Sequence, residues 1–348
     1  MNACNGWPER LTNETELDEL MSRPHPGVVR LMERLPGDIT ILGIAGKMGL
    51  SLGALAVRSI RAAGVSKKVY GISRFSDADA IAALEQSGII PIRCDLLDPS
   101  AVQALPLTPN VIFMAGRKFG TGGQESLTWA MNTLVPAHVG SHFRTSRIAA
   151  FSTGCVYPLI PVERVGCTER DPPDPVGEYA QSCLGRERIF EYASRAHGTP
   201  VCLLRLNYAL DVRYGVIHDL ARAIWEGRPV NRNVGHFNGI WQGDANAHAL
   251  LALECCTTPP TLLNITGPET IPVAEVAETL GRLMGRKVSY EGNPGPVAYL
   301  NNAGLSHSLF GYPQVPVAHV IRWTADWVRQ GGRSLGKPTH FEVADGKY

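Results

Sequence analysis

The sequence has no long apolar segment. No hydrophobic run approaches the roughly 18 residues that a membrane-spanning helix needs. The N-terminal stretch is polar and acidic and lacks the apolar core of a signal peptide. Both absences predict a cytoplasmic protein that does not enter a membrane.

An excess of charge of one sign is also missing. Lys and Arg number 33 and Asp and Glu number 32, which gives a formal net charge of +1. No basic block with interleaved aromatic residues, of the kind that binds nucleic acid, is present. We therefore expect a small-molecule substrate and neither a nucleic acid nor a membrane as partner.

Cysteine is present, but not in metal-binding patterns. None of the eight cysteines forms a Cys-x-x-Cys pair, and Cys255 and Cys256 are adjacent, which does not fit a zinc knuckle. The sequence thus predicts no metal site. Most of these thiols are expected to be small buried residues, and their reduced state fits a cytoplasmic protein.

The strongest positive signal is the stretch from residue 38 to 53. A short apolar run passes into Gly43-x-x-Gly46-x-x-Gly49, and apolar residues then follow at helical spacing from Met48 onward. Glycines let backbone amides approach a pyrophosphate, and the helix N-terminus adds positive potential. The turn, with Lys47 and Met48, is therefore predicted to bind a dinucleotide. Taken alone, the three glycines are equally compatible with a plain turn.

Strand and helix patterns alternate after this point. Repeated strand–helix units predict an α/β doubly wound parallel-sheet Rossmann domain, followed by a smaller mixed C-terminal substrate lobe. The expected strands are 39–44, 68–72, 89–93, 111–115, 148–152, 201–206, 261–265 and 287–290. The expected helices are 48–63, 76–87, 124–145, 178–196, 216–227, 245–256, 272–285 and 316–330.

The chain divides into three parts. Residues 1–36 are predicted to form a helical arm, which packs on the main domain or on a second subunit. Residues 37–206 form the NAD(P)-binding domain, and 232–265 contribute to it. Residues 207–231 and 266–348 form the substrate-binding lobe, and the tail after Gly331 is expected to be loosely ordered.

The end of the second strand bears on the choice of cofactor. Dinucleotide folds usually place an acid there to bind the ribose 2′-hydroxyl, but this chain has Ser73 followed by Arg74. A guanidinium without a neighbouring carboxylate favours a 2′-phosphate, hence NADP over NAD; the alternative is a solvated surface arginine. Further cofactor contacts are expected where the third and fourth strands end, from Asp95, Leu96, Met114, Ala115 and Gly116.

In the order of its motifs, the chain resembles the extended short-chain dehydrogenase/reductases, the NAD-dependent epimerase/dehydratase family. The resemblance covers about residues 38 to 327. Besides the glycine turn and the two strand ends, it rests on Asn132, Ser152-Thr153-Gly154-Cys155-Val156-Tyr157, Tyr179-Ala180-Gln181-Ser182, Glu187, Arg205, Asp244 and Asn264-Ile265-Thr266-Gly267. It implies that Asn132 belongs to the cofactor site. It also implies a homodimer through helices 124–145 and 178–196.

The resemblance also implies the chemistry. In the family, a tyrosine acts as general acid or base toward a substrate alcohol or carbonyl, and a serine or threonine hydrogen-bonds the same oxygen. Carried over, Thr153 is the hydroxyl group and Tyr179 the acid or base. A lysine four residues after the tyrosine lowers its pKa in the family, because a tyrosine of pKa about 10 is a poor base at neutral pH.

That lysine is missing here, because position 183 is Cys183. A neutral thiol cannot supply the field of an ammonium or hold ribose hydroxyls in the same way. Arg186 lies about 20° from Tyr179 around the helix and leans toward the helix N-terminus, so it is a candidate substitute. The alternative is a solvated Arg186. Cys183 is more readily a packing residue than a nucleophile, since no histidine is placed to activate it.

The substrate contacts depart from the family as well. The sixth strand leads into Asn207, without the Gly-Pro that the family usually has nearby. Loop 117–123 and segment 236–242 are expected to line the pocket, where Lys118 and Trp241 would bind substrate together with Asn207. Such polar donors and aromatic faces suit a sugar-like ligand, although ordinary loops share them.

Two functions remain open. The first is an NAD(P)-dependent oxidoreductase or epimerase that uses Thr153 and Tyr179 on a hydroxyl- or keto-bearing, sugar-derived substrate. The second, suggested by Cys183, is a catalytically weak NAD(P)-binding regulator or sensor.

Overall fold

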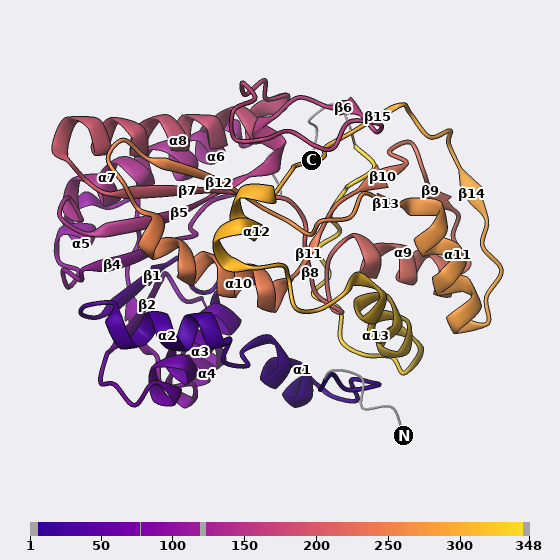
Figure 1. Ribbon diagram of the computed structural model, residues 1–348, viewed down its shortest axis with the longest axis horizontal. Helices are drawn as coiled ribbons and strands as arrows, with labels where there is room; N and C mark the ends of the chain where they lie inside the picture. Colours follow the sequence, from indigo (N-terminus) through magenta and orange to yellow (C-terminus); the bar gives the residue numbers. More distant parts are fainter. Residues whose placement is uncertain (1–5, 77, 119–122, 344–348) are drawn as a thin grey trace.

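The computed structural model describes residues 6–76, 78–118 and 123–343, and a seven-stranded sheet forms its centre (Figure 1). The strand order is β12-β7-β5-β4-β1-β2-β3, and every neighbouring pair is parallel. The strands are β1 (Ile39–Leu42), β2 (Val69–Ser73), β3 (Ile90–Arg93), β4 (Asn110–Phe113), β5 (Arg147–Thr153), β7 (Val201–Leu206) and β12 (Thr261–Ile265). The predicted doubly wound Rossmann fold is confirmed.

Helices cover both faces of this sheet. One apolar core joins it to α2 (Pro26–Arg34), α3 (Gly49–Ala62) and α10 (Gln242–Leu251). A second core joins its other face to α5 (Pro99–Gln103), α7 (Val135–His142) and α8 (Gly177–His197). β1 and β4 are buried along their whole length, as expected for central strands of a parallel sheet. α4 (Ala78–Gln86) lies beside β3 and contributes Leu84 to the first core.

The predicted helix 124–145 has a break in its hydrogen-bond pattern. It consists of α6 (Glu125–Trp129), the π-helical segment η1 (Ala130–Leu134) and α7. Pro136, at the start of α7, has no N–H to donate to the carbonyl of Asn132, and the N–H of Val135 bonds instead to the carbonyl of Ala130. The wider turn lies at Asn132, a predicted site residue.

The C-terminal lobe is built from helices and short strand pairs. α9 (Val216–Trp225), α11 (Val273–Met284) and α13 (Val317–Arg329) pack on one another around a separate apolar core. The predicted strand 287–290 is reduced to β14 (Tyr290–Glu291), which pairs with β9 (Val230–Asn231) outside the main sheet. The other short pairs are β8 (Ala209–Leu210) with β11 (Ile240–Trp241), β10 (His236–Phe237) with β13 (Ile271–Pro272), and β6 (Ile160–Pro161) with β15 (Val297–Ala298).

The two helices of the N-terminal arm pack against the rest of the same chain. Asn13 caps α1 (Glu14–Met21) by accepting a hydrogen bond from the N–H of Glu16, and the apolar residues of α1 enter the core of the lobe. α2 packs against α3 and α10 and begins at Pro26, because proline is tolerated at the first helical position. In the described chain the apolar faces of both helices are therefore used within the monomer.

The tail after α13 is attached to the lobe. The N–H and hydroxyl of Thr339 both donate to Asp219 Oδ2, at 2.7 and 2.6 Å. Ser334 lies 3.0 Å from a ring nitrogen of His218, and Phe341 is buried in the core of the lobe. Residues 333–343 are thus held by specific contacts, and the expectation of a loosely ordered tail is wrong for them.

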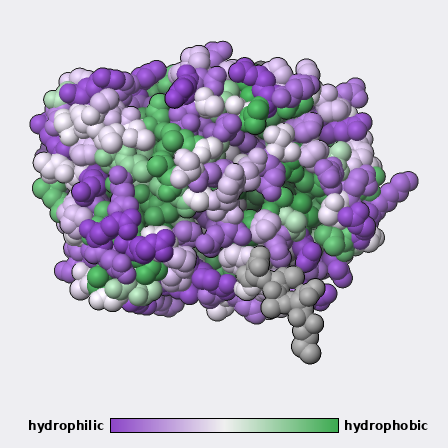
Figure 2. Space-filling view, in the orientation of Figure 1, coloured by the Kyte–Doolittle hydropathy of each residue, from purple (hydrophilic) through white to green (hydrophobic). Residues whose placement is uncertain are grey.

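The surface is largely polar, with apolar areas between (Figure 2). One such area overlies the region of α12 (Gly304–Phe310), a helix that the sequence patterns did not predict. Leu305 and Leu309 of this helix are exposed. Among the described residues, no helix is both long and apolar enough to cross a membrane.

The packing of α2 can be tested by unfolding. Leu31 is fully buried in the core shared with the sheet, so Leu31→Ala should lower the free energy of unfolding by about 2–5 kcal/mol in urea denaturation. The neighbouring Glu33 is exposed, and Glu33→Ala should change it by no more than about 0.5 kcal/mol. Equal, small effects of both changes would show that the arm does not belong to the folded core.

Candidate functional site

The glycine turn after β1 is built for a close approach of the backbone. Gly43 has a φ of 87°, and a Cβ there would lie 2.6 Å from the amide nitrogen of Ala115. A Cβ on Gly49 would lie 1.9 Å from the carbonyl oxygen of Ile44. Only glycine fits these two positions without a shift of the backbone. Gly46 is exposed just before α3 begins, so the turn presents backbone and a helix N-terminus to a ligand, as a phosphate site requires.

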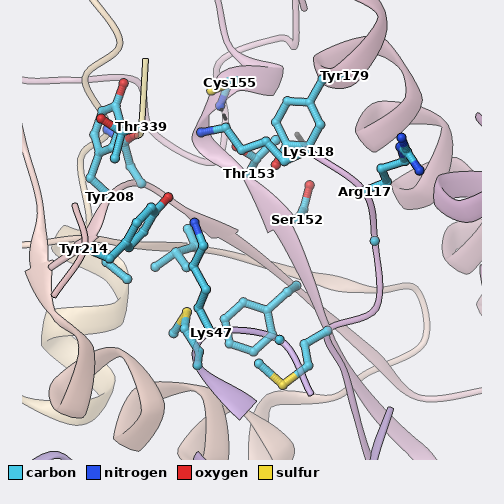
Figure 3. Close-up of a pocket in the computed structure, with 18 of the residues that line it drawn as sticks. Lys47, Arg117, Lys118, Ser152, Thr153, Cys155, Tyr179, Tyr208, Tyr214 and Thr339 are labelled. Carbon is cyan, nitrogen blue, oxygen red and sulfur yellow. Dashed lines mark hydrogen bonds between the residues drawn. The ribbon is translucent and has the colours of Figure 1, made fainter. Parts of the chain in front are cut away.

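A cavity of about 360 Å³ opens beside this turn, where β1, β4, β5 and β7 end (Figure 3). Ligands bind at this edge in open parallel sheets. Among the predicted site residues, the cavity brings together Gly46, Lys47, Met48, Met114, Gly116, Lys118, Thr153, Tyr179, Arg186 and Asn207. The candidate site is therefore assembled from segments that lie far apart in the sequence.

Thr153 and Tyr179 lie side by side in the cavity wall (Figure 3). Thr153 is the last residue of β5, and its Oγ1 accepts a hydrogen bond of 3.2 Å from the N–H of Cys155. Tyr179 lies in the first turn of α8, close enough to Thr153 for a side-chain bond between them to act on the pKa of Tyr179. Burial raises the pKa of Tyr179 well above its usual value, and the Cys183 and Cys155 thiols add to this. Arg186 and the bond to Thr153 act in the opposite direction.

Arg186 is buried beneath the cavity. Its Nη1 donates to the carbonyl oxygen of Phe151 at 2.8 Å, and its Nη2 donates to Asn132 Oδ1 at 2.5 Å. The side chain is 5% exposed, so the alternative of a solvated arginine is wrong. Gly116 allows this arrangement, since a Cβ there would lie 2.3 Å from Nη2. Arg186 thus places a permanent positive charge under the wall that carries Tyr179.

Cys183 is a packing residue. Its side chain is fully buried, and burial raises the pKa of its thiol, so the reactive thiolate is disfavoured. The side-chain amide of Asn132 lies 3.9 Å from the sulfur and also donates to the Ser182 hydroxyl. The same Asn132 accepts from the N–H of Arg117 and donates to its carbonyl. Asn132 therefore links α8 to the loop that follows β4.

Several predicted residues lie outside the cavity. Ser73 is the last residue of β2, Arg74 follows it and Asp95 follows β3, and Arg74 and Asp95 are exposed. Leu96 and Ala115 are buried in the apolar core between the sheet and α5, α7 and α8. Residues 119–122, predicted to line the pocket within loop 117–123, lie outside the described residues. The cavity thus covers one part of the predicted cofactor site.

Trp241 does not reach the site. It is 2% exposed and packs in the core of the lobe, with its ring 5.6 Å from that of Trp323. The lining of the cavity does not include it, so its prediction as a substrate contact is wrong in this structure. Asn207 does line the cavity, and its Nδ2 donates to Asn238 Oδ1 at 2.6 Å and to the carbonyl of Tyr299 at 3.1 Å.

Lining residues that the sequence patterns missed include Tyr214, Lys337 and Thr339. The Lys47 ammonium lies 3.2 Å from the centre of the Tyr214 ring. Burial, followed by repulsion from Lys118 and Lys337, lowers the pKa of Lys47 to about 7, and Asp219 opposes this. No motif marks these positions, because the tail reaches the cavity only through the folding of the lobe. Together the lysines make the cavity a site for an anionic ligand.

Comparison with known proteins agrees with this geometry. The model of the NAD dependent epimerase/dehydratase family matches residues 39–228, more than half of the chain. A search of curated proteins found no match.

Similar solved structures include UDP-glucose 4-epimerase of Thermotoga maritima with UDP-glucose, at 16% identity and a TM-score of 0.69. A point mutant of UDP-glucuronic acid 4-epimerase from Bacillus cereus, with a fluorinated UDP-glucuronic acid and NAD, is 18% identical with a TM-score of 0.68. UDP-glucose 4-epimerase of Thermus thermophilus with NAD is 19% identical with a TM-score of 0.68. Each alignment covers 84% of this chain and 99% of the other. At these identities the likeness shows the fold.

The lowered pKa of Lys47 predicts pH-dependent anion binding. Because an anion binds the protonated ammonium preferentially, the affinity for inorganic pyrophosphate should fall as the pH rises through about 7. Lys47→Met should bind about 10- to 100-fold more weakly at lower pH and should lose this dependence. Isothermal titration calorimetry across this range measures both effects. An unchanged pH dependence in Lys47→Met would assign the titration to another group.

Proposed function

Because the chain belongs to the NAD-dependent epimerase/dehydratase family, we propose that it is an NAD(P)-dependent oxidoreductase or epimerase. Its substrate is a hydroxyl- or keto-bearing, sugar-derived molecule. The observation that carries the proposal is the placement of Thr153 and Tyr179 side by side in the wall of a cavity that begins at the glycine turn (Figure 3). The sugar nucleotides bound in similar solved structures support the substrate class.

The residues that line the cavity have different roles in the proposed reaction. A nicotinamide dinucleotide bound there would accept or return a hydride. Thr153 holds the substrate oxygen by a hydrogen bond, and Tyr179 transfers a proton to or from the same oxygen. The raised pKa of Tyr179 keeps its phenol protonated at neutral pH, so it is ready to donate. Accepting a proton requires nearby positive charge, and Arg186 supplies it. Lys118 and Asn207 offer donors to the substrate.

The glycine turn supports a dinucleotide as the cofactor. Gly43 and Gly49 leave no room for a side chain, while the exposed Gly46 and the adjacent Lys47 face a ligand. At the adenosine end, β2 ends at Ser73 and the exposed Arg74 follows, where a carboxylate would select NAD. We therefore assign NADP as the preferred form and NAD as the second.

A homodimer and a cytoplasmic location complete the proposal. α6, η1 and α8 pack on each other and expose the apolar side chains of Leu127, Leu134 and Tyr192, which a second copy would cover. The seven described cysteines are free thiols, and five of them are buried, which suits a reducing compartment.

The role of Tyr179 can be tested by removing its phenol hydroxyl. With a panel of UDP-sugars and either dinucleotide, Tyr179→Phe should lower turnover by about 10²- to 10⁴-fold, because the proton-transfer group is removed. Thr153→Val should lower turnover as well. The matched control is Tyr312→Phe, since Tyr312 is exposed and does not line the cavity, and its turnover should equal that of the wild type. Tyr179→Phe with wild-type turnover would exclude the proposed mechanism.

The choice of cofactor rests on Arg74. Removal of its guanidinium by Arg74→Ala should weaken NADPH binding by about 10- to 100-fold and leave NADH binding unchanged, because only NADPH carries the 2′-phosphate. Fluorescence titration with both dinucleotides measures this. Arg144 is an exposed arginine just before β5, so Arg144→Ala serves as the control. Equal losses for both dinucleotides would contradict recognition of the 2′-phosphate by Arg74.

A further inference from the structure

The replacement of the family lysine by Cys183 leaves two roles unassigned. One is to place positive charge beside Tyr179, and the other is to donate hydrogen bonds to the ribose hydroxyls of the dinucleotide. The thiol of Cys183 is fully buried and can do neither. Two cations near Tyr179 are therefore of interest, Arg186 on α8 and Lys118 on the loop after β4.

Arg186 suits the first role and not the second. Its guanidinium is fixed, because both terminal nitrogens donate to Phe151 and Asn132. Its remaining Nε has no hydrogen-bond partner among the described residues and is buried. An arginine keeps its charge at every relevant pH. Arg186 thus acts on Tyr179 through its field, while its terminal nitrogens are already used within the protein.

Lys118 suits the second role. Its side chain lines the cavity beside Thr153 and Tyr179, and its ammonium lies 5.8 Å from the centre of the Tyr179 ring (Figure 3). Burial lowers the pKa of the Lys118 ammonium, and the nearby Cys155 and Cys183 thiols and Asp219 act in the opposite direction. The ammonium of Lys118 therefore lies near Cys183 and Tyr179, although it comes from another segment.

The loop that carries Lys118 is fixed by hydrogen bonds at the preceding residue, Arg117. The N–H of Arg117 donates to Asn132 Oδ1 at 3.1 Å, and the carbonyl of Arg117 accepts from Asn132 Nδ2 at 3.2 Å. Asn132 Oδ1 also accepts from Arg186. One buried amide thus fixes Arg186 and the backbone before Lys118 with respect to each other, so both cations are positioned against the same tyrosine.

We propose that the two roles of the missing lysine are divided between two residues. Arg186 is a positioning residue that supplies the fixed positive charge beneath Tyr179, and Lys118 is the ammonium that donates hydrogen bonds to the ribose hydroxyls of the bound dinucleotide. This inference rests on the proposed function, and it assigns Lys118 to the cofactor in addition to the substrate. Cys183 then marks a relocation of the lysine rather than its loss.

The role of Lys118 is tested by removing this lysine and restoring one at position 183. Lys118→Ala should weaken NADPH and NADH binding by about 10- to 100-fold in a fluorescence titration, because charge-assisted hydrogen bonds are lost. The double change Lys118→Ala with Cys183→Lys should recover most of this affinity. Lys287 is exposed in the distant lobe, so Lys287→Ala is the matched control and should bind like the wild type. Thermal unfolding of each variant confirms that it is folded.

The test for Arg186 is the pH profile of turnover. Arg186→Gln should move the midpoint for the ionisation of Tyr179 to higher pH, whereas Arg186→Lys should keep it near that of the wild type. A merely structural role would lower turnover and leave the midpoint in place. The ultraviolet absorbance of tyrosinate, compared with that of Tyr179→Phe, gives the same midpoint without a substrate.

The outcomes separate the inference from the proposed function. A wild-type protein that binds neither dinucleotide would overturn the proposed function, and the inference with it. Binding by the wild type and equally by Lys118→Ala would overturn only the role of Lys118. Weakened binding that a folded double variant does not recover would overturn the relocation. An unmoved midpoint in Arg186→Gln would overturn the role of Arg186.

Discussion

The placement of the candidate site depends on the buried polar contacts that fix α8 to the sheet. Arg186 bonds to the carbonyl of Phe151 in β5, and the next residue, Glu187, accepts from Ser152 in β5 and pairs with Arg205 in β7, at 2.7 Å for the shorter contact. Buried charges without partners cost several kcal/mol, so α8 cannot slide along the sheet without losing these contacts. Tyr179, two turns earlier on the same helix, is held against Thr153 at the end of β5 for this reason.

Local pattern was enough to predict the sheet and the glycine turn, and the resemblance to a known family implied the Thr153–Tyr179 pair. Each of these lies at a strand end or helix start, and the topology of a parallel sheet brings such ends together. The failures have a different origin. The indole of Trp241 suits a sugar site and an apolar core equally well. Its packing against Trp323 places it in the core, and that contact joins residues far apart in the sequence. Lys337 and Thr339 reach the cavity through Asp219 and the lobe, which no local spacing can reveal.

The charge of the cavity constrains what it can hold. Lys47, Lys118 and Lys337 are near enough to repel one another, and Asp219 is the acid that acts on Lys47 against them. Like charges in a partly buried space destabilise the empty protein, and a bound anion relieves that repulsion. Phosphate groups at the glycine turn would do this while also bonding to backbone amides. The same lysines that favour a ligand thus make the empty cavity electrostatically unfavourable.

The missing lysine weighs less against catalysis than the sequence pattern indicates. A motif fixes which residue carries a charge, whereas Tyr179 responds only to where positive charge lies and how well it is shielded from water. Arg186 acts on the pKa of Tyr179 against the effect of burial, Lys118 lies 5.8 Å from the centre of the same ring, and the amide of Asn132 holds Arg186 and the residue before Lys118 in place. The thiol at position 183 then only has to fill space, which a buried cysteine does well. The absence of a lysine from position 183 of α8 is therefore compatible with positive charge near Tyr179 that comes from other positions.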